Sequence, residues 1–180
     1  MSGQRGHCMA SLMENIIAIL NQEEREYASL VKLSEEKTPI IIKGDLQELN
    51  RITGEEQLVV ERIQKLEKER IQTMKDIADV TNHASEELKI PDLITMMSSR
   101  PEEREQLQEV HAKLKQTLGN MTAVNDRNRE LLKSSLEMVQ FEMSLLQSMK
   151  QAPETADYNK DAYNTGSIMG SGTKRFDAKQ

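Results

Sequence analysis

The side chains best suited to ligate a metal or to transfer a proton are few in this sequence, and its histidines lie far apart from one another. The three histidines are His7, His83 and His111, and the one cysteine is Cys8. A zinc site needs three or four such ligands at short spacings, and a di-iron helical bundle needs Glu-x-x-His pairs. Neither pattern occurs, so we expect no metal and no cofactor. A single cysteine also excludes an internal disulfide, which fits a reducing compartment.

The known catalytic motifs are also absent from the sequence. There is no HExxH helix, no Gly-rich phosphate loop and no Gly-x-Ser-x-Gly turn. His111 follows Val110 of an apolar stripe and in this respect is like the phosphoacceptor of a histidine-kinase dimerisation helix. The next residue is Ala112 rather than an acid, however, and we interpret His111 as a boundary residue beside a helical seam. The sequence therefore predicts that the protein is not an enzyme.

Charge and hydropathy exclude two further classes of partner. The chain of 180 residues has 24 Lys+Arg and 30 Asp+Glu, a net charge of −6. An acidic chain without a dense basic patch argues against nucleic acid as a partner. No apolar run is long enough to span a membrane, and the N-terminus lacks the apolar core of a leader. We expect a cytoplasmic protein without stable membrane insertion.

The elements that position any site are helices. From Pro101 to Met149 the apolar residues recur at steps of three and four, which is the spacing of one face of an α-helix. Two earlier stretches, 9–36 and 46–82, have the same period. A short apolar segment between Pro91 and Pro101 predicts one or two helical turns that cap the bundle. The fold class predicted is all-α: an elongated antiparallel bundle or coiled coil of three long helices, with a short helix in the second connection.

The predicted boundaries follow from the residues that end helices. Pro39 is expected to end or kink the first helix near residue 36, Gly44 to terminate the segment after it, and Asp45 to cap the second helix. Residues 1–8 are expected to be a flexible lead, 9–150 the helical domain, and 151–180 a disordered tail. Its apolar residues also allow the interpretation that the tail orders on a partner: Tyr158, Tyr163, Ile168, Met169 and Phe176.

The third helix departs from a simple seam in two ways. Asn125 and Asn128 occupy positions where the stripe should be apolar, and beyond Leu131 the stripe widens to more than one face. A polar residue in a seam commonly fixes register or oligomeric state. The alternative is that one or both asparagines hydrogen-bond a neighbouring backbone, either that of a bound partner or that of the connection at 83–100.

Several segments together resemble the FlgN family, flagellar type III export chaperones for the hook–filament junction proteins. They are KGDLQELNRITGEEQLVVERIQKLEKER, the IPDL connection, VNDRNRELLKSSLEMVQFEMSLL, and a tail with Tyr163, Gly166 and FDAK. The resemblance implies a non-catalytic chaperone that holds the C-terminal helices of hook-associated proteins unpolymerised and delivers them to the export gate. It places the client on the last helix, with these candidates: Asn125, Asn128, Leu131, Leu132, Leu136, Met138, Val139, Met143 and Leu146.

The residues themselves suggest how such a client would bind. One stripe per helix is enough for a three-helix bundle, so the second stripe in 131–149 is a surface that an added amphipathic helix can cover. The same stripe would equally pack on the first helix or on a second protomer, and a homodimer stays open. Two other functions also remain at this point: a self-associating coiled-coil scaffold, and a regulatory adaptor that acts through residues 151–180.

Overall fold

The computed structural model describes residues 2–82 and 88–151, and this part of the chain is helical without strands. Its elements are α1 (Ser2–Lys43), α2 (Leu46–Thr81), α3 (Ile90–Met96), the 3-10 turn η1 (Met97–Ser99) and α4 (Pro101–Gln151). The all-α prediction is confirmed. The chain divides into two units, residues 1–139 and 140–180, which are described separately. Of the expected tail, 151–180, Gln151 is the last residue of α4, and 152–180 lie outside the described residues.

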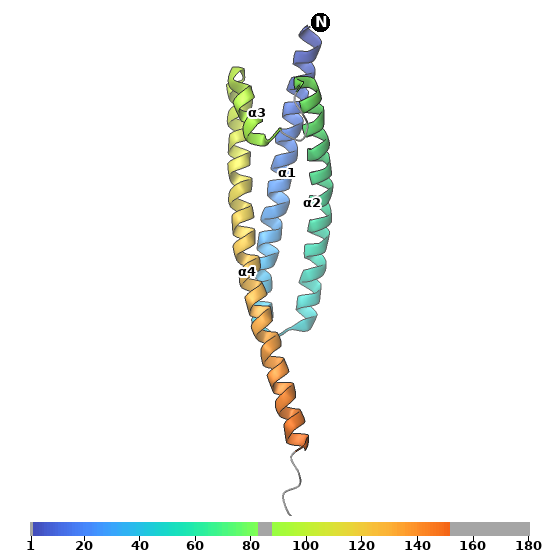
Figure 1. The fold of residues 1–180 in the computed structure, drawn as a ribbon, viewed down its shortest axis with the longest axis vertical. Helices are drawn as coiled ribbons and strands as arrows, with labels where there is room; N and C mark the ends of the chain where they lie inside the picture. Colours follow the sequence, from blue (N-terminus) through green and yellow to red (C-terminus); the bar gives the residue numbers. More distant parts are fainter. Residues whose placement is uncertain (1, 83–87, 152–180) are drawn as a thin grey trace, which may run out of the picture. The chain divides into compact units, whose positions relative to one another are not determined.

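Side-chain bonds fix the direction of the three long helices within residues 1–139 (Figure 1). Between α1 and α2, Asn15 bonds Thr73 and Ser34 bonds Glu56, so the two helices run antiparallel. Between α1 and α4, Glu24 accepts from Thr117 and Thr38 bonds Asn128, so these two helices run parallel. Helices adjacent in sequence therefore alternate in direction, as an up-down-up arrangement requires.

The prediction that α1 ends before Pro39 is wrong. The helix continues to Lys43 with Pro39 inside it, and it begins at Ser2 rather than at Met9. Proline removes one donor from the helix ladder. Burial of Ile41, at 4% exposure, and a Schellman motif hold the turn that follows. In this motif the Gly44 amide donates to the Ile41 carbonyl, and the Asp45 amide donates to the Ile40 carbonyl.

The turn between α1 and α2 matches the expected roles of Gly44 and Asp45. Gly44 has φ +68°, the left-handed conformation that suits glycine at the residue after a helix. The Asp45 carboxylate then accepts a hydrogen bond of 3.1 Å from the Glu48 amide and caps α2. Helix α2 begins at Leu46 as predicted and ends at Thr81, with Asn82 left-handed at its C-cap.

The glycines of this hairpin give a first testable prediction. Gly54 lies inside α2, and a Cβ added there meets nothing within 4 Å. Gly54→Ala should therefore raise the free energy of unfolding by about 1 kcal/mol, because alanine loses less backbone entropy in a helix. Gly44→Ala should lower it by about 1 kcal/mol, because φ is positive there. Chemical denaturation measures both changes. Changes of the same sign would contradict the different backbone conformations assigned to Gly54 and Gly44.

Two clusters of buried side chains form the core of residues 1–139. The larger cluster lies where α3 and η1 cover the bundle, and Leu93 and Met97 are buried in it with Leu107 of α4. This confirms that the segment between Pro91 and Pro101 forms short helical turns, and shows that it packs into the core. The smaller cluster comprises Leu30 of α1 with Val59 and Ile63 of α2, and Met121 of α4 packs against it.

A buried carboxylate lies between the two clusters. Glu23 of α1 is 4% exposed, and one of its oxygens lies 3.0 Å from Nε of Arg70 in α2. Burial raises the pKa of Glu23, and the attraction of Arg70 opposes this shift only in part. A raised pKa means that the folded state binds this proton more tightly than the unfolded state does. The contribution of Glu23 to stability is therefore lost as the pH rises from its ordinary pKa of 4.5 through the raised value.

Glu23→Gln tests this pH dependence, because the amide keeps an oxygen for Arg70 and cannot ionise. The free energy of unfolding of the wild type minus that of the variant should fall as the pH rises through this window. Denaturant titrations at a series of pH values measure the difference. Glu61→Gln, which removes one carboxylate from the exposed surface of α2, is the control for the general loss of a negative charge. A flat profile for Glu23→Gln would show that burial does not raise its pKa.

Candidate functional site

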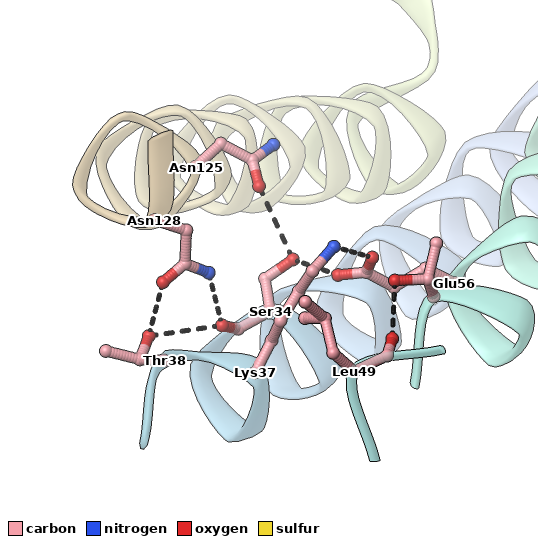
Figure 2. Close-up of polar contacts among 8 residues, drawn as sticks. Ser34, Lys37, Thr38, Leu49, Glu56, Asn125 and Asn128 are labelled. Atoms are coloured by element: carbon pink, nitrogen blue, oxygen red, sulfur yellow. Dashed lines mark hydrogen bonds and ion pairs between the residues drawn. The ribbon is translucent and has the colours of Figure 1, made fainter. Parts of the chain in front are cut away.

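Asn128 is the buried residue in the polar interruption of the α4 seam. It is 5% exposed, and its side-chain amide Nδ2 donates to the backbone carbonyl of Ser34 in α1 at 2.7 Å. Its Oδ1 accepts from the Thr38 hydroxyl, also at 2.7 Å. Figure 2 shows the amide facing α1, with Thr38 on one side and the Ser34 carbonyl on the other. Both ends of the Asn128 amide are therefore satisfied within the chain.

Ser34 extends this network from α1 to α2. Its side chain is 1% exposed, and its hydroxyl donates to Glu56 Oε1 at 2.9 Å. The other Glu56 oxygen lies 2.6 Å from the Lys37 ammonium, so one carboxylate joins two residues of α1 (Figure 2). The Asn125 Oδ1 lies 3.4 Å from the Ser34 Oγ, a longer contact made from an exposed position. The network thus ties all three long helices together at one level.

The two asparagines differ, although the sequence presents them as a pair. The expectation that one bonds a neighbouring backbone is confirmed for Asn128, and the backbone is that of α1, not the connection at 83–100. Such a bond fixes the axial register of α4 on α1, because a shift of one turn would leave the buried amide without partners. Asn125 is exposed and makes only the long contact.

Sequence reasoning did not find Ser34, Thr38 or Glu56, the partners of these asparagines. A signal was present: Ser34 and Thr38 follow Leu30 at steps of four, so they continue the apolar stripe of α1 with hydroxyl residues. Polar residues at seam positions of two helices suggest that they meet. The sequence alone does not state the register that brings residue 128 opposite residue 38.

Beyond Asn128 the seam of α4 becomes progressively exposed. Leu131 and Leu132 are half-buried, whereas Leu136 and Val139 are 62% and 51% exposed. The length of α1 explains the change. Thr38 bonds Asn128, α1 ends five residues later at Lys43, and five helical residues rise only about 7.5 Å. Because α4 runs parallel to α1, the α4 residues after about 133 lie beyond the end of α1 and have neither α1 nor α2 beside them within residues 1–139.

The remaining candidate residues are exposed as well. Met138 is 66% exposed at the end of the first unit, and Met143 and Leu146 are 56% and 59% exposed in the unit 140–180. We call the exposed apolar residues of this helix the apolar end of α4. They are Leu136, Met138, Val139, Phe141, Met143, Leu145, Leu146 and Met149.

The chemistry available to these groups is burial of apolar surface rather than catalysis. Large side chains exposed on a long helix gain stability when a second apolar surface covers them. Among the described residues, no three His, Cys, Asp or Glu side chains are grouped so that they could hold a metal ion. No helix in 2–82 or 88–151 has a stretch long and apolar enough to cross a membrane.

This fold and site define a class: an all-α protein with a network of polar side chains between three long helices and exposed apolar side chains on the second half of the last helix. The family model described as FlgN protein matches residues 9–165, and the chain belongs to the FlgN family. These proteins are chaperones of flagellar protein export and not enzymes. A relative from Bacillus subtilis (strain 168), the uncharacterized protein YvyG, is 31% identical over 132 residues, covering 72% of this chain and 79% of the relative. No solved structure matches the chain.

Proposed function

We propose that this chain is a cytoplasmic chaperone that binds the C-terminal helices of hook-associated proteins. It keeps these proteins from assembling prematurely and delivers them to the flagellar export gate. The observation that carries the proposal is the apolar end of α4, where eight large apolar side chains are between 49% and 67% exposed. Soluble proteins rarely leave so many apolar residues exposed together unless a partner covers them.

The form of this surface favours a helical client. It lies on one long helix, α4, without a described strand edge that could add a strand. An amphipathic helix packs on such a surface through side chains at steps of three and four, which is the spacing of Leu132, Leu136, Val139, Met143 and Leu146. The methionines at 138, 143 and 149 are flexible and allow more than one client sequence to fit.

The structure changes which of the candidate residues we propose for this role. Asn128 is buried and bonded within the chain, so we assign it to the bundle and not to the client contact. Leu131 and Leu132 are half-buried at the boundary. The proposed contact residues are Leu136, Met138, Val139, Met143 and Leu146, with exposed Asn125 at the margin.

The experiment is titration calorimetry of the full chain with purified hook-associated proteins, intact and lacking their C-terminal helices. We expect a complex of one chaperone with one intact client, and no heat with the shortened client. Light scattering of the chaperone alone addresses the second candidate, a self-associating scaffold, which the same exposed face would also serve. A stable homo-oligomer that binds no hook-associated protein would favour the scaffold and reject the proposed function.

A further inference from the structure

The tip of the α1–α2 hairpin carries apolar side chains that the bundle does not use. Ile42 in the last turn of α1 is 67% exposed, and Leu46 at the start of α2 is 72% exposed. The turn between them is well anchored, because Ile41 and Ile52 on either side of it are buried at 4% and 0% exposure. The exposure is thus not caused by fraying. Connecting segments lie at the surface, and two large apolar side chains exposed at one turn mark a candidate contact surface when more exposed apolar residues lie near them.

The same end of the bundle is where the seam of α4 loses its partners. Along α4 the residues that face α1 and α2 recur at steps of three, four and seven, and the recurrence continues without a break past the tip. The positions are Leu107, Val110, Leu114, Met121, Asn128, Leu132, Leu136 and Val139. Figure 1 shows the tip lying beside α4, as the Thr38–Asn128 bond one turn earlier requires. Leu136 and Val139 therefore continue an interface that α1 and α2 have already established.

We propose that the client's helical end takes the place of α1 and α2 beyond their tip. It packs side-on against Leu136 and Val139, and its terminus packs end-on against Ile42 and Leu46. The inference rests on the proposed function and adds a second contact to it: the tip of the hairpin sets where along α4 the client helix stops. The client would thus extend the bundle in line, with α4 as the shared helix.

The composition of this part of α4 favours a client over a second copy of the chain. From Leu132 to Met149 the charged residues are Lys133, Glu137 and Glu142, with a net charge of −1. A self-paired coiled coil usually fixes its partner and register through charged flanking positions, which are too few here. An adaptable, methionine-containing face suits a partner whose own sequence varies.

The test is the double substitution Ile42→Gln with Leu46→Gln in the full chain. Both side chains are exposed and glutamine is a good helix former, so the thermal midpoint should not change. Affinity for the C-terminal segment of a hook-associated protein, measured by calorimetry, should fall by about tenfold or more. Leu58→Gln, which removes an apolar side chain of α2 that is also more than half exposed (57%), is the matched control and should bind as the wild type does.

Three other outcomes would overturn the end-on contact, and one of them would also overturn the proposed function. Unchanged affinity of the tip variant, together with weak binding by Leu136→Gln, would show that the client lies on α4 alone and would overturn the end-on contact. A tip variant that shifts the oligomeric mass and leaves client affinity unchanged would make the tip a self-interface, and would also overturn it. If the wild-type chain binds no hook-associated protein, the proposed function fails and this inference fails with it.

Discussion

On the function proposed above, replacing Leu136 and Val139 of α4 with glutamine should weaken the binding of a hook-associated protein by about 100-fold or more and leave the fold unchanged. Fully burying a leucine or valine side chain contributes about 1.5–3 kcal/mol, so losing two of them removes roughly 3–6 kcal/mol from the complex. Both residues are more than half exposed in the free protein and make no core contact there. The expected loss therefore falls on binding alone.

Two measurements separate this result from unfolding. Thermal and denaturant unfolding of the variant should match the wild type within about 0.5 kcal/mol, as is usual for exposed positions. Calorimetric titration with the client then gives the affinity of a folded protein. Leu58→Gln controls for the general loss of an exposed leucine, since this residue is 57% exposed on α2. Wild-type affinity in the double variant would move the client away from this part of α4.

The periodicity of the sequence predicted two of the long helices closely. Helix α2 begins at Leu46 and α4 at Pro101, as expected, because a capping aspartate and a proline mark those starts independently of the rest of the fold. The predicted end of α1 was wrong because Pro39 disfavours the helix only locally. The burial of Ile41 and the Schellman hydrogen bonds at Gly44 together stabilise the helix as far as Lys43. A local helix-breaking signal can be overridden by packing that the sequence does not display.

The site was predicted less completely for a related reason. The sequence shows an excess of apolar residues after Leu131, but which of them are covered depends on where α1 ends opposite α4. That level is set by the bonds of Asn128 to Ser34 and Thr38, which lie 94 and 90 residues away along the chain. Asn125 and Asn128 are the same residue type three positions apart, and only the structure shows that one is buried and the other exposed.

Asn128→Asp should be strongly destabilising at neutral pH and much less so in acid. The substitution keeps the shape of the side chain but replaces the amide nitrogen, which is a donor, with a carboxylate oxygen, which is an acceptor. The Nδ2 position lies 2.7 Å from the Ser34 carbonyl, and an ionised carboxylate would place two acceptors against each other there. A buried acceptor without a donor, carrying a charge, costs about 2–4 kcal/mol. We expect the free energy of unfolding to fall by that amount at pH 7.

The pH dependence follows from the proton. A protonated carboxyl can again donate to the Ser34 carbonyl, so the folded state should hold this proton tightly and the pKa of the substituted side chain should be raised. A raised pKa gives stability that is present at low pH and lost as the pH rises through it. The difference in the free energy of unfolding between wild type and variant should therefore become smaller as the pH falls. Denaturant titrations from neutral to acidic pH measure this difference. Asn120→Asp, at an exposed position of the same helix, is the matched control and should change little at any pH.

The same variant decides whether Asn128 belongs to the bundle or to the client surface. If the asparagine locks α4 on α1, the substitution alters stability, and the affinity of the folded fraction for a hook-associated protein stays within a factor of about three, since the apolar end of α4 is untouched. If Asn128 instead contacts the client, stability should be nearly independent of the substitution and affinity should fall. A role in helix register changes stability and not affinity, and a contact with the client changes affinity and not stability. Measuring both on one protein preparation therefore distinguishes the two roles.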